Sequence, residues 1–201
     1  MKGIVIEGQL RTDLGKRHNK TLRADGSVPC VLYGGGENVH FYAAEVAVKN
    51  IIYNSHFTTA DIQVEGKTYS AFIKEAQFHP VTDKVQHIDF QLLVPGHPVV
   101  TNLPVSLHGL AVGVKAGGKL LQKVRQVKVK AMPDKLVSEI KVDVTHLEVG
   151  KSVRIRDINY EGIQIMMSPA IPIASVEITR ALRAAAAAAA AAAKGAKGKK
   201  K

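Results

Sequence analysis

The segment at residues 60–78, ADIQVEGKTYSAFIKEAQF, constrains the fold most, because two runs of alternating apolar and polar residues flank a Glu-Gly-Lys turn. Alternation with a period of two is typical of a strand with one buried and one solvated face. Two such runs joined by a short glycine-containing turn predict a β-hairpin. The chain is therefore expected to be mainly β.

Other segments in the first 94 residues fit the same sheet. Further strands are predicted at residues 3–10, 28–33, 38–43 and 84–94. Pro29 lies near the start of its run, which favours an edge strand or the first position of a strand, because proline cannot donate to a ladder. Residues 43–54, AAEVAVKNIIYN, carry apolar residues at helical spacing and predict one short amphipathic helix.

The strand expected at residues 84–94, KVQHIDFQLLV, carries unusual polar residues for a barrel or sheet core. Strict alternation predicts that His87 and Asp89 share one face with Val85. It also predicts that Ile88 and Phe90 lie on the opposite face. The two polar residues are therefore expected side by side on one surface.

A break in the pattern follows at residues 95–98, PGHP, where we place a domain boundary. The 201 residues suffice for two small domains, and the 46% hydrophobic content suffices for their cores. Strand-like segments resume at regular intervals and predict a second β-rich domain over residues 95–180; they are residues 100–109, 120–132, 138–144, 163–167 and 173–179. Residues 181–201 form an Ala/Lys-rich basic tail that we expect to be mobile.

The positive charge is unevenly distributed. The net charge is +11, yet residues 1–94 hold 10 basic and 10 acidic side chains. Within this neutral segment, residues 11–23 hold five bases and one acid, so a positive potential is focused on what we expect to be a loop. Residues 95–180 hold 12 bases and 7 acids, and residues 181–201 hold 6 bases and no acid.

No enzyme signature is present. The glycine spacing near Gly8 and Gly15 does not match a phosphate loop, and the glycines after Tyr33 do not form a dinucleotide fingerprint. Cys30 lies in an apolar run and is expected to be a packed residue that is neither a nucleophile nor part of a disulfide. We therefore predict no catalytic residues, no cofactor and no small-molecule substrate.

Two further site types receive little support. His87 and Asp89, with His79, could begin a metal site, but no other ligand stands at a recognisable spacing, so no metal is predicted. The N-terminal apolar run is too short for a signal peptide, and no segment has the length of a membrane span. The expected location is the cytoplasm, without a membrane partner.

The basic segment favours contact with RNA, although exposed basic segments are often only solvated surface. The bases Arg11, Lys16, Arg17, Lys20 and Arg23 are able to neutralise phosphates, and the three arginines are also able to bind guanine edges. The smaller polar residues His18, Asn19 and Thr21 suit bases or 2′-hydroxyls. Leu14 and Leu22 are expected to anchor the segment to the core.

Two separated motifs carry a family resemblance. The first is GKRHNKTLRADGSVPCVLYGGG, and the second is QFHPVTDKVQHIDFQ, with its Gln-x-His-Pro and Gln-His-x-Asp-Phe elements. Together with GVKAGGKL and SEIKVDVTHLEVGKSVRIRDI they resemble, in order, the bacterial ribosomal protein family L-twenty-five in its long, general stress protein form. The resemblance covers about residues 3–180.

The resemblance implies a component of the large ribosomal subunit whose N-terminal β-barrel, here residues 1–94, binds an internal-loop helix of 5S ribosomal RNA. The contacts it implies come from both motifs; they are Arg11, Lys16, Asn19, Lys20, Tyr33, Gln77, His79, His87 and Asp89. The carboxylate of Asp89 would accept hydrogen bonds from base amino groups or orient His87. The second domain and the tail would contact other ribosomal RNA or ribosomal proteins.

One position departs from the family pattern, which commonly has two adjacent basic residues before Leu-Arg. Here Thr21 follows Lys20, so we expect one phosphate contact fewer and keep the hydroxyl of Thr21 as a possible donor. A different interpretation also stays open at this point. The chain could be a stress-linked regulatory factor that binds RNA or protein away from the ribosome.

Overall fold

The computed structural model describes residues 3–36, 38–180 and 183–184, and it is mainly β, as the alternation predicted. The chain forms two compact units. The first contains Met1–Pro104, Val129–Glu139 and Gly162–Gln164, and the second contains Val105–Lys128, Ile140–Glu161 and the chain from Ile165 onward. The mobile tail that we expect at residues 181–201 lies outside the described residues, except for Arg183 and Ala184.

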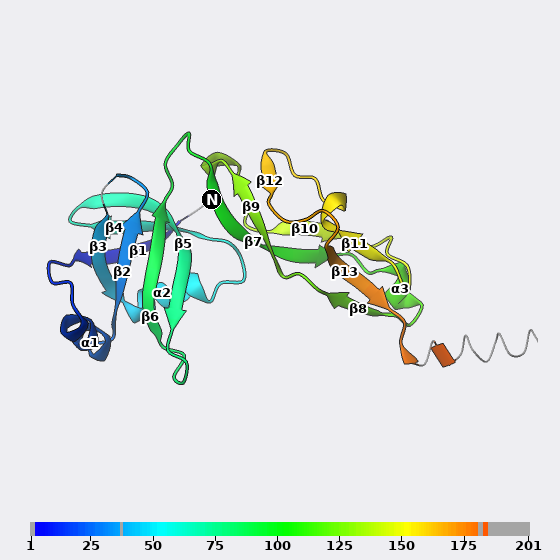
Figure 1. Ribbon diagram of the computed structural model, residues 1–201, viewed down its shortest axis with the longest axis horizontal. Helices are drawn as coiled ribbons and strands as arrows, with labels where there is room; N and C mark the ends of the chain where they lie inside the picture. The colour runs from blue at the N-terminus through cyan, green and yellow to red at the C-terminus, as the bar shows by residue number, and fades with distance from the viewer. Residues whose placement is uncertain (1–2, 37, 181–182, 185–201) are drawn as a thin grey trace, which may run out of the picture. The chain divides into compact units, whose positions relative to one another are not determined.

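The first unit contains a closed six-stranded barrel with the order β1-β3-β2-β6-β5-β4 (Figure 1). Its strands are β1 (Ile4–Leu10), β2 (Ser27–Tyr33), β3 (Val39–Ala44), β4 (Thr59–Val64), β5 (Lys67–Phe78) and β6 (Val85–Leu92). The β1–β4 and β2–β6 pairs are parallel, and the other neighbours are antiparallel. Closure leaves the barrel no open edge at which another chain could add a strand.

The hairpin at residues 60–78 is confirmed as β4 and β5, with Val64 opposite Lys67. Its two turn residues, Glu65 and Gly66, have φ angles of 51° and 78°. Two consecutive positive φ values give a turn whose twist matches that of the flanking strands, and glycine adopts this conformation without steric cost.

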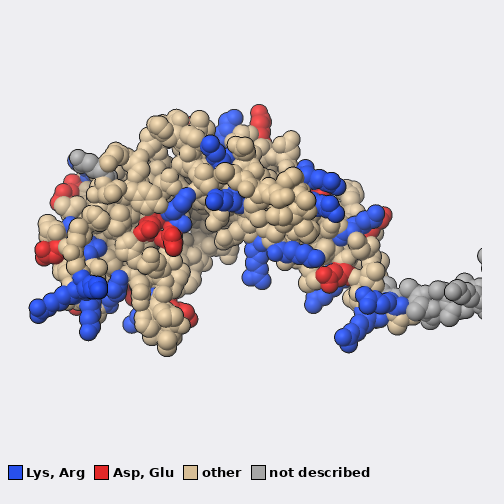
Figure 2. All heavy atoms as spheres, in the orientation of Figure 1, with Lys and Arg blue, Asp and Glu red and all other residues tan. Residues whose placement is uncertain are grey.

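The basic segment was expected as a loop, but residues Lys16–Ala24 form helix α1. Lysine, arginine, leucine and alanine all favour helices, and Leu22 is 8% exposed and packs this helix on the barrel. Leu14, the other expected anchor, lies before the helix and is 60% exposed, so that prediction was wrong. Lys and Arg side chains gather on the surface over α1 (Figure 2).

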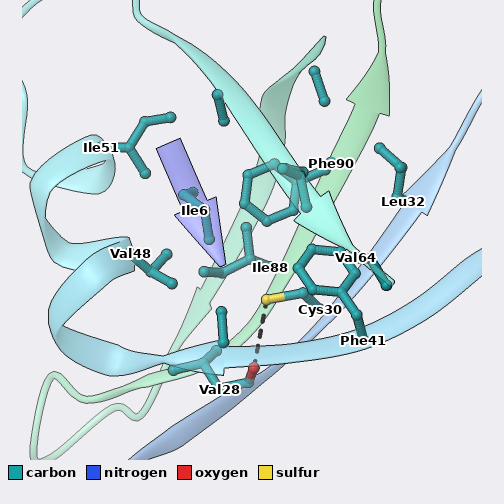
Figure 3. Close-up of a cluster of buried hydrophobic side chains, with 14 of the residues drawn as sticks. Ile6, Val28, Cys30, Leu32, Phe41, Val48, Ile51, Val64, Ile88 and Phe90 are labelled. Atoms are coloured by element: carbon teal, nitrogen blue, oxygen red, sulfur yellow. Dashed lines mark hydrogen bonds between the residues drawn. The ribbon is translucent and has the colours of Figure 1, made fainter. Parts of the chain in front are cut away.

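The barrel core is filled by apolar side chains from all six strands and from helix α2 (Glu45–Ile52), which is the predicted short helix. Val48 and Ile51 of α2 point toward Ile6, Ile88 and the other core residues (Figure 3). Cys30 is fully buried, and its Sγ donates to the carbonyl oxygen of Val28 at 3.4 Å (Figure 3). Burial raises the pKa of this thiol far above its ordinary value, as expected of a packed residue.

Two details of the strands differ from the prediction. The strand with Pro29 is not an edge strand, because β2 lies between β3 and β6; the β6 ladder begins only at Cys30, so the missing N–H of Pro29 is tolerated. Val85 is buried with Ile88 and Phe90 and does not share the face of His87. A register shift between Gln77 and Phe78 in β5 interrupts the alternation at this point.

The remaining strands form a sheet of order β10-β7-β9-β12 and a sheet of order β11-β13-β8 (Figure 1). Their bounds are β7 (Val99–His108), β8 (Lys119–Gln122), β9 (Gln126–Ala131), β10 (Ile140–Asp143), β11 (Ser152–Arg154), β12 (Ile163–Ile165) and β13 (Pro172–Glu177). Helix α3 (Val112–Lys115) and the 3-10 turns Pro133–Lys135 and Ile155–Asp157 complete the second half. The single run expected at residues 120–132 is two strands, β8 and β9.

Residues after position 94 also complete the first unit. Val99, Ala131 and Leu136 are buried in one cluster with Phe72 of β5, which is fully buried. The ring of Phe57 lies 5.7 Å from that of Phe72 and belongs to the same cluster. The hydrophobic interior of the first unit therefore includes chain segments that follow the barrel in the sequence.

Candidate RNA interface

Helix α1 presents a basic surface to solvent and packs on the barrel through one buried residue, Leu22. Lys16, Arg17, Lys20 and Arg23 are all exposed. The helix packs on β2, and its N-cap, Gly15, contributes no side chain to the cap. Because no acidic residue occupies the first turn, the positive end of the helix dipole adds to the charge of Lys16 and Arg17. This surface is suited to attract phosphate groups.

Arg11 and Asn19 are joined to each other in the structure. The backbone N–H of Arg11 donates to the carbonyl of His40 at 2.9 Å, which extends the β1–β3 ladder. A terminal guanidinium nitrogen of Arg11 donates to Oδ1 of Asn19. Arg11 is only 8% exposed, and its Nε is one of two buried side-chain atoms without a hydrogen-bond partner among the described residues. Arg11 therefore ties α1 to the barrel.

The second group of predicted residues lies on the outer surface of the barrel. In the β5–β6 ladder Gln77 is opposite His87, and Glu75 is opposite Asp89. In the β2–β6 ladder Asp89 is level with Val31, and Tyr33 is level with Gln91. Neighbouring strands thus bring Tyr33, Gln77, His87 and Asp89 onto one polar surface, which we call the strand face.

A close contact between His87 and Asp89 fixes the centre of the strand face. Nδ1 of His87 lies 2.8 Å from Oδ1 of Asp89, and both side chains are about a quarter to a third exposed. With Nδ1 directed at the carboxylate, the ring is held in one orientation and Nε2 remains for another partner. The second carboxylate oxygen of Asp89 is an additional acceptor.

The environment of Tyr33 links the same residues electrostatically. Partial burial is the main cause that raises the pKa of Tyr33 above its ordinary value, and the carboxylates of Asp89 and Glu75 raise it further. The phenol therefore keeps its proton at neutral pH and is able to donate a hydrogen bond.

Glu75 was not predicted as a site residue, although it stands directly opposite Asp89. Two like charges at directly opposite positions destabilise a sheet locally. The signal that could have found Glu75 is the register of the β5–β6 hairpin, but the shift between Ile73 and Glu75 hides it from an alternation pattern.

His79 and Arg23 lie at the end of the barrel where the β5–β6 turn joins the two strands. The backbone of His79 pairs with that of Lys84 and Asp83, and Nδ1 of its ring accepts from the N–H groups of Val81 and Thr82. Arg23 donates from Nε to the carbonyl oxygen of Gln86 at 3.0 Å, which connects α1 to β6. Arg23 of α1 and His79 of the turn therefore both lie near the start of β6.

Two predicted residues of α1 remain, His18 and Thr21. His18 is half-buried beside Leu22 on the inner side of α1. The hydroxyl of Thr21 donates to the carbonyl of Arg17 at 3.3 Å within the helix. Because this bond occupies its proton, Thr21 contributes little to an external contact in this conformation.

A metal cluster and a membrane-spanning helix are both absent from the part of the chain that the structure describes. No group of three or more His, Cys, Asp and Glu side chains within residues 3–36, 38–180 and 183–184 could hold a metal ion. Over the same residues, no helix has the length and apolar character needed to cross a membrane.

Comparison with known proteins gives a consistent result over most of the chain. Residues 6–90 match the model of the Ribosomal L25p family, and residues 98–180 match that of the C-terminal domain of ribosomal protein TL5. The large ribosomal subunit protein bL25 of Bacteroides thetaiotaomicron is 41% identical over 186 residues, covering 90% of this chain and 95% of its own.

Two further relatives agree with the first. The large ribosomal subunit protein bL25 of Porphyromonas gingivalis is 41% identical over 183 residues, which is 90% of this chain and 95% of that protein. The protein of the same name from Cytophaga hutchinsonii is 42% identical over 182 residues, with the same coverage. The similarity therefore extends through both units.

Proposed function

Because the chain belongs to the Ribosomal L25p family, whose members are structural ribosomal proteins and not enzymes, we propose that it binds 5S ribosomal RNA in the large subunit. The binding surface consists of α1 and the strand face of the first unit. The protein is a component of ribosomes in the cytoplasm. The second unit, whose residues carry excess positive charge, contacts other ribosomal RNA or ribosomal proteins.

The observation that carries this proposal is the arrangement of two different surfaces around β2. Helix α1 packs on one part of β2 and carries exposed bases, while Tyr33 at the end of the same strand lies beside β6 of the strand face. Phosphate contacts supply attraction and position, whereas polar groups on base edges supply specificity. A surface with both parts suits an irregular RNA helix.

The roles of individual residues follow from their partners. Lys16, Arg17 and Lys20 neutralise phosphates of the RNA backbone. Asp89 accepts a hydrogen bond from a base amino group, and His87, oriented by Asp89, uses Nε2 toward a base or a 2′-hydroxyl. Arg11, together with Asn19, holds α1 in place and so positions the bases of the helix.

Ribosome binding is tested by cosedimentation of the full chain with large subunits after a salt wash. The proposal expects the protein in the subunit fraction and protection of an internal-loop helix of 5S RNA in footprinting. A protein found only in the ribosome-free fraction would favour a regulatory factor that acts elsewhere.

The full chain is the correct sample for this test. Val99, Ala131 and Leu136 pack against Phe72, and all three follow residue 94. A fragment that ends at residue 94 would expose Phe72, which makes weak binding by such a fragment uninformative.

A further inference from the structure

A cavity of about 150 Å³ lies in the first unit, where α1 ends, β2 and α2 begin and the β5–β6 turn closes. It is lined by residues of these four elements and of β6; they are Arg23, Ser27, Val28, Glu45, His79, Thr82, Lys84, Val85 and Gln86. The cavity is separate from the strand face, since neither the His87–Asp89 pair nor Tyr33 contributes to its wall.

His79 lines this cavity, and its ring is held by the β5–β6 turn. Its Nδ1 accepts from the backbone N–H groups of Val81 and Thr82, each at 3.3 Å. A neutral imidazole that accepts at Nδ1 carries its proton at Nε2. The turn therefore fixes the tautomer of His79 so that Nε2 donates.

Arg23 is also held in one orientation. Its Nε donates to the carbonyl oxygen of Gln86 at 3.0 Å. The two terminal nitrogens of a guanidinium fixed in this way keep their N–H groups for an external acceptor, and paired donors of this geometry match the oxygens of a phosphate.

The other polar side chains in the wall are able to donate hydrogen bonds, the amide of Gln86 included, with one exception. Within the described residues, the side chains of Ser27, Thr82 and Lys84 make no hydrogen bond or ion pair. The exception is the carboxylate of Glu45, which lies 3.0 Å from Nζ of Lys49. Because Lys49 neutralises Glu45, the charges of Arg23 and Lys84 dominate the cavity.

We propose that this cavity binds a single phosphate group, with Arg23, His79 and Lys84 as the principal donors and the hydroxyls of Ser27 and Thr82 as secondary donors. Pockets for drug-sized ligands typically measure about 300–1,000 Å³, so a cavity of about 150 Å³ suits one tetrahedral anion better than a nucleotide. In the complex the group is a phosphodiester of the bound RNA, an assignment that rests on the proposed function. Free inorganic phosphate has the same chemistry and is the other possible source.

The assignment of the bound phosphate to the RNA backbone is tested by Lys84→Met in the full chain, with Lys67→Met as the matched control. Lys67 is an exposed lysine at the β4–β5 turn and does not line the cavity. We expect Lys84→Met to weaken 5S RNA binding about tenfold, as for a charge-assisted hydrogen bond, and to reduce the slope of log affinity against log salt by about one contact. Lys67→Met should change neither quantity.

Binding of free phosphate to the cavity is tested by NMR of the ¹⁵N-labelled wild-type protein titrated with inorganic phosphate. We expect the Nε2 resonance of His79 to shift with saturation in the wild type and not in Lys84→Met. If His79 responds to inorganic phosphate but Lys84→Met binds RNA like the control, the cavity takes free phosphate and its assignment to the RNA backbone is overturned. No response of His79 together with equal RNA binding by both variants overturns the cavity as a phosphate site.

The two proposals fail separately. If the wild-type protein does not bind 5S RNA, the proposed function fails, while the inorganic phosphate titration still reports on the cavity. Unfolding temperatures of both variants show whether they are folded. Thr82→Val, which changes only a hydroxyl on an exposed turn, provides the second variant and should weaken RNA binding by a smaller factor than Lys84→Met.

Discussion

Helix α1 and the strand face belong to the same unit, but they are built in opposite ways. The helix carries exposed positive charges and is anchored through Leu22 and the Arg11–Asn19 contact. The strand face carries a His–Asp pair on a strand that has neighbours on both sides and a fully buried core beneath it. The difference separates attraction, which needs only charge, from recognition, which needs side chains in fixed positions.

The largest expected effect tests how differently the two surfaces are supported. Ile88→Ala removes a fully buried side chain under the strand face and should lower the free energy of unfolding by about 2–5 kcal/mol. Leu22→Ala should cost less, because α1 packs on the barrel from outside and Leu22 retains 8% exposure. Chemical denaturation measures both. Equal losses would show that α1 is as integral to the barrel as β6.

Asp89→Asn should have the next largest effect, and it acts on recognition. We expect affinity for 5S RNA to fall about tenfold, the scale of a hydrogen bond to a charged group, with an unchanged salt slope. Filter binding over a range of salt concentrations measures both quantities. If Asp89 only repelled phosphates, the same substitution would tighten binding.

Lys20→Ala should show the opposite signature. Loss of one phosphate contact should reduce the salt slope by about one and weaken binding severalfold at low salt, while discrimination between 5S RNA and an unrelated duplex stays the same. Lys67→Ala is the control, since it removes another exposed lysine, at the β4–β5 turn. Identical behaviour of the two variants would contradict the role of α1.

Glu75→Gln gives a smaller effect with an informative sign. Removing one of two opposed carboxylates should stabilise the protein slightly, because the repulsion with Asp89 ends. We expect RNA affinity to fall about twofold, a fraction of the roughly tenfold effect of a full charged hydrogen bond. Titration of Glu75→Gln and of the wild type with the same RNA measures this. Tighter binding by Glu75→Gln would show that the carboxylate repels the RNA and does not accept a hydrogen bond from it.

The smallest effect is the pH dependence that Tyr33 contributes. Its pKa is raised in the folded protein, so the folded state holds the phenol proton more tightly than the unfolded state. This contribution to stability is present below the ordinary pKa of tyrosine, about 10, and is lost as the pH rises through the folded value. The free energy of unfolding of Tyr33→Phe, measured as a function of pH, should lack this loss at alkaline pH. A pH profile identical to that of the wild type would contradict the prediction.

The sequence predicted the two surfaces with unequal success, and the reasons are physical. The hairpin at residues 60–78 and the short helix predicted within residues 43–54 have a clear periodicity. Both are confirmed, the helix as Glu45–Ile52. The β5–β6 register shifts hid Glu75 and moved Val85 into the core, since a bulge changes which side chains share a face. Local patterns carry no information about such long-range pairing.

The predicted structure of the basic segment was wrong for a different reason. Its charges suggested a solvated loop, although Lys, Arg, Leu and Ala are all helix formers, and one buried leucine suffices to hold the helix on the barrel. The burial of Arg11 was equally hidden, because its partners His40 and Asn19 come from β3 and α1. The charge pattern identified an exposed basic surface, but it did not predict that this surface is a helix.

The central claim is that 5S RNA contacts α1 and the strand face together. Ultraviolet cross-linking of the full chain to 5S RNA, followed by mass spectrometry, tests it most directly. We predict cross-linked peptides from residues 16–24 and from residues 75–91 in the same complex. Cross-links confined to residues 105–128 and 140–161 of the second unit would contradict the claim.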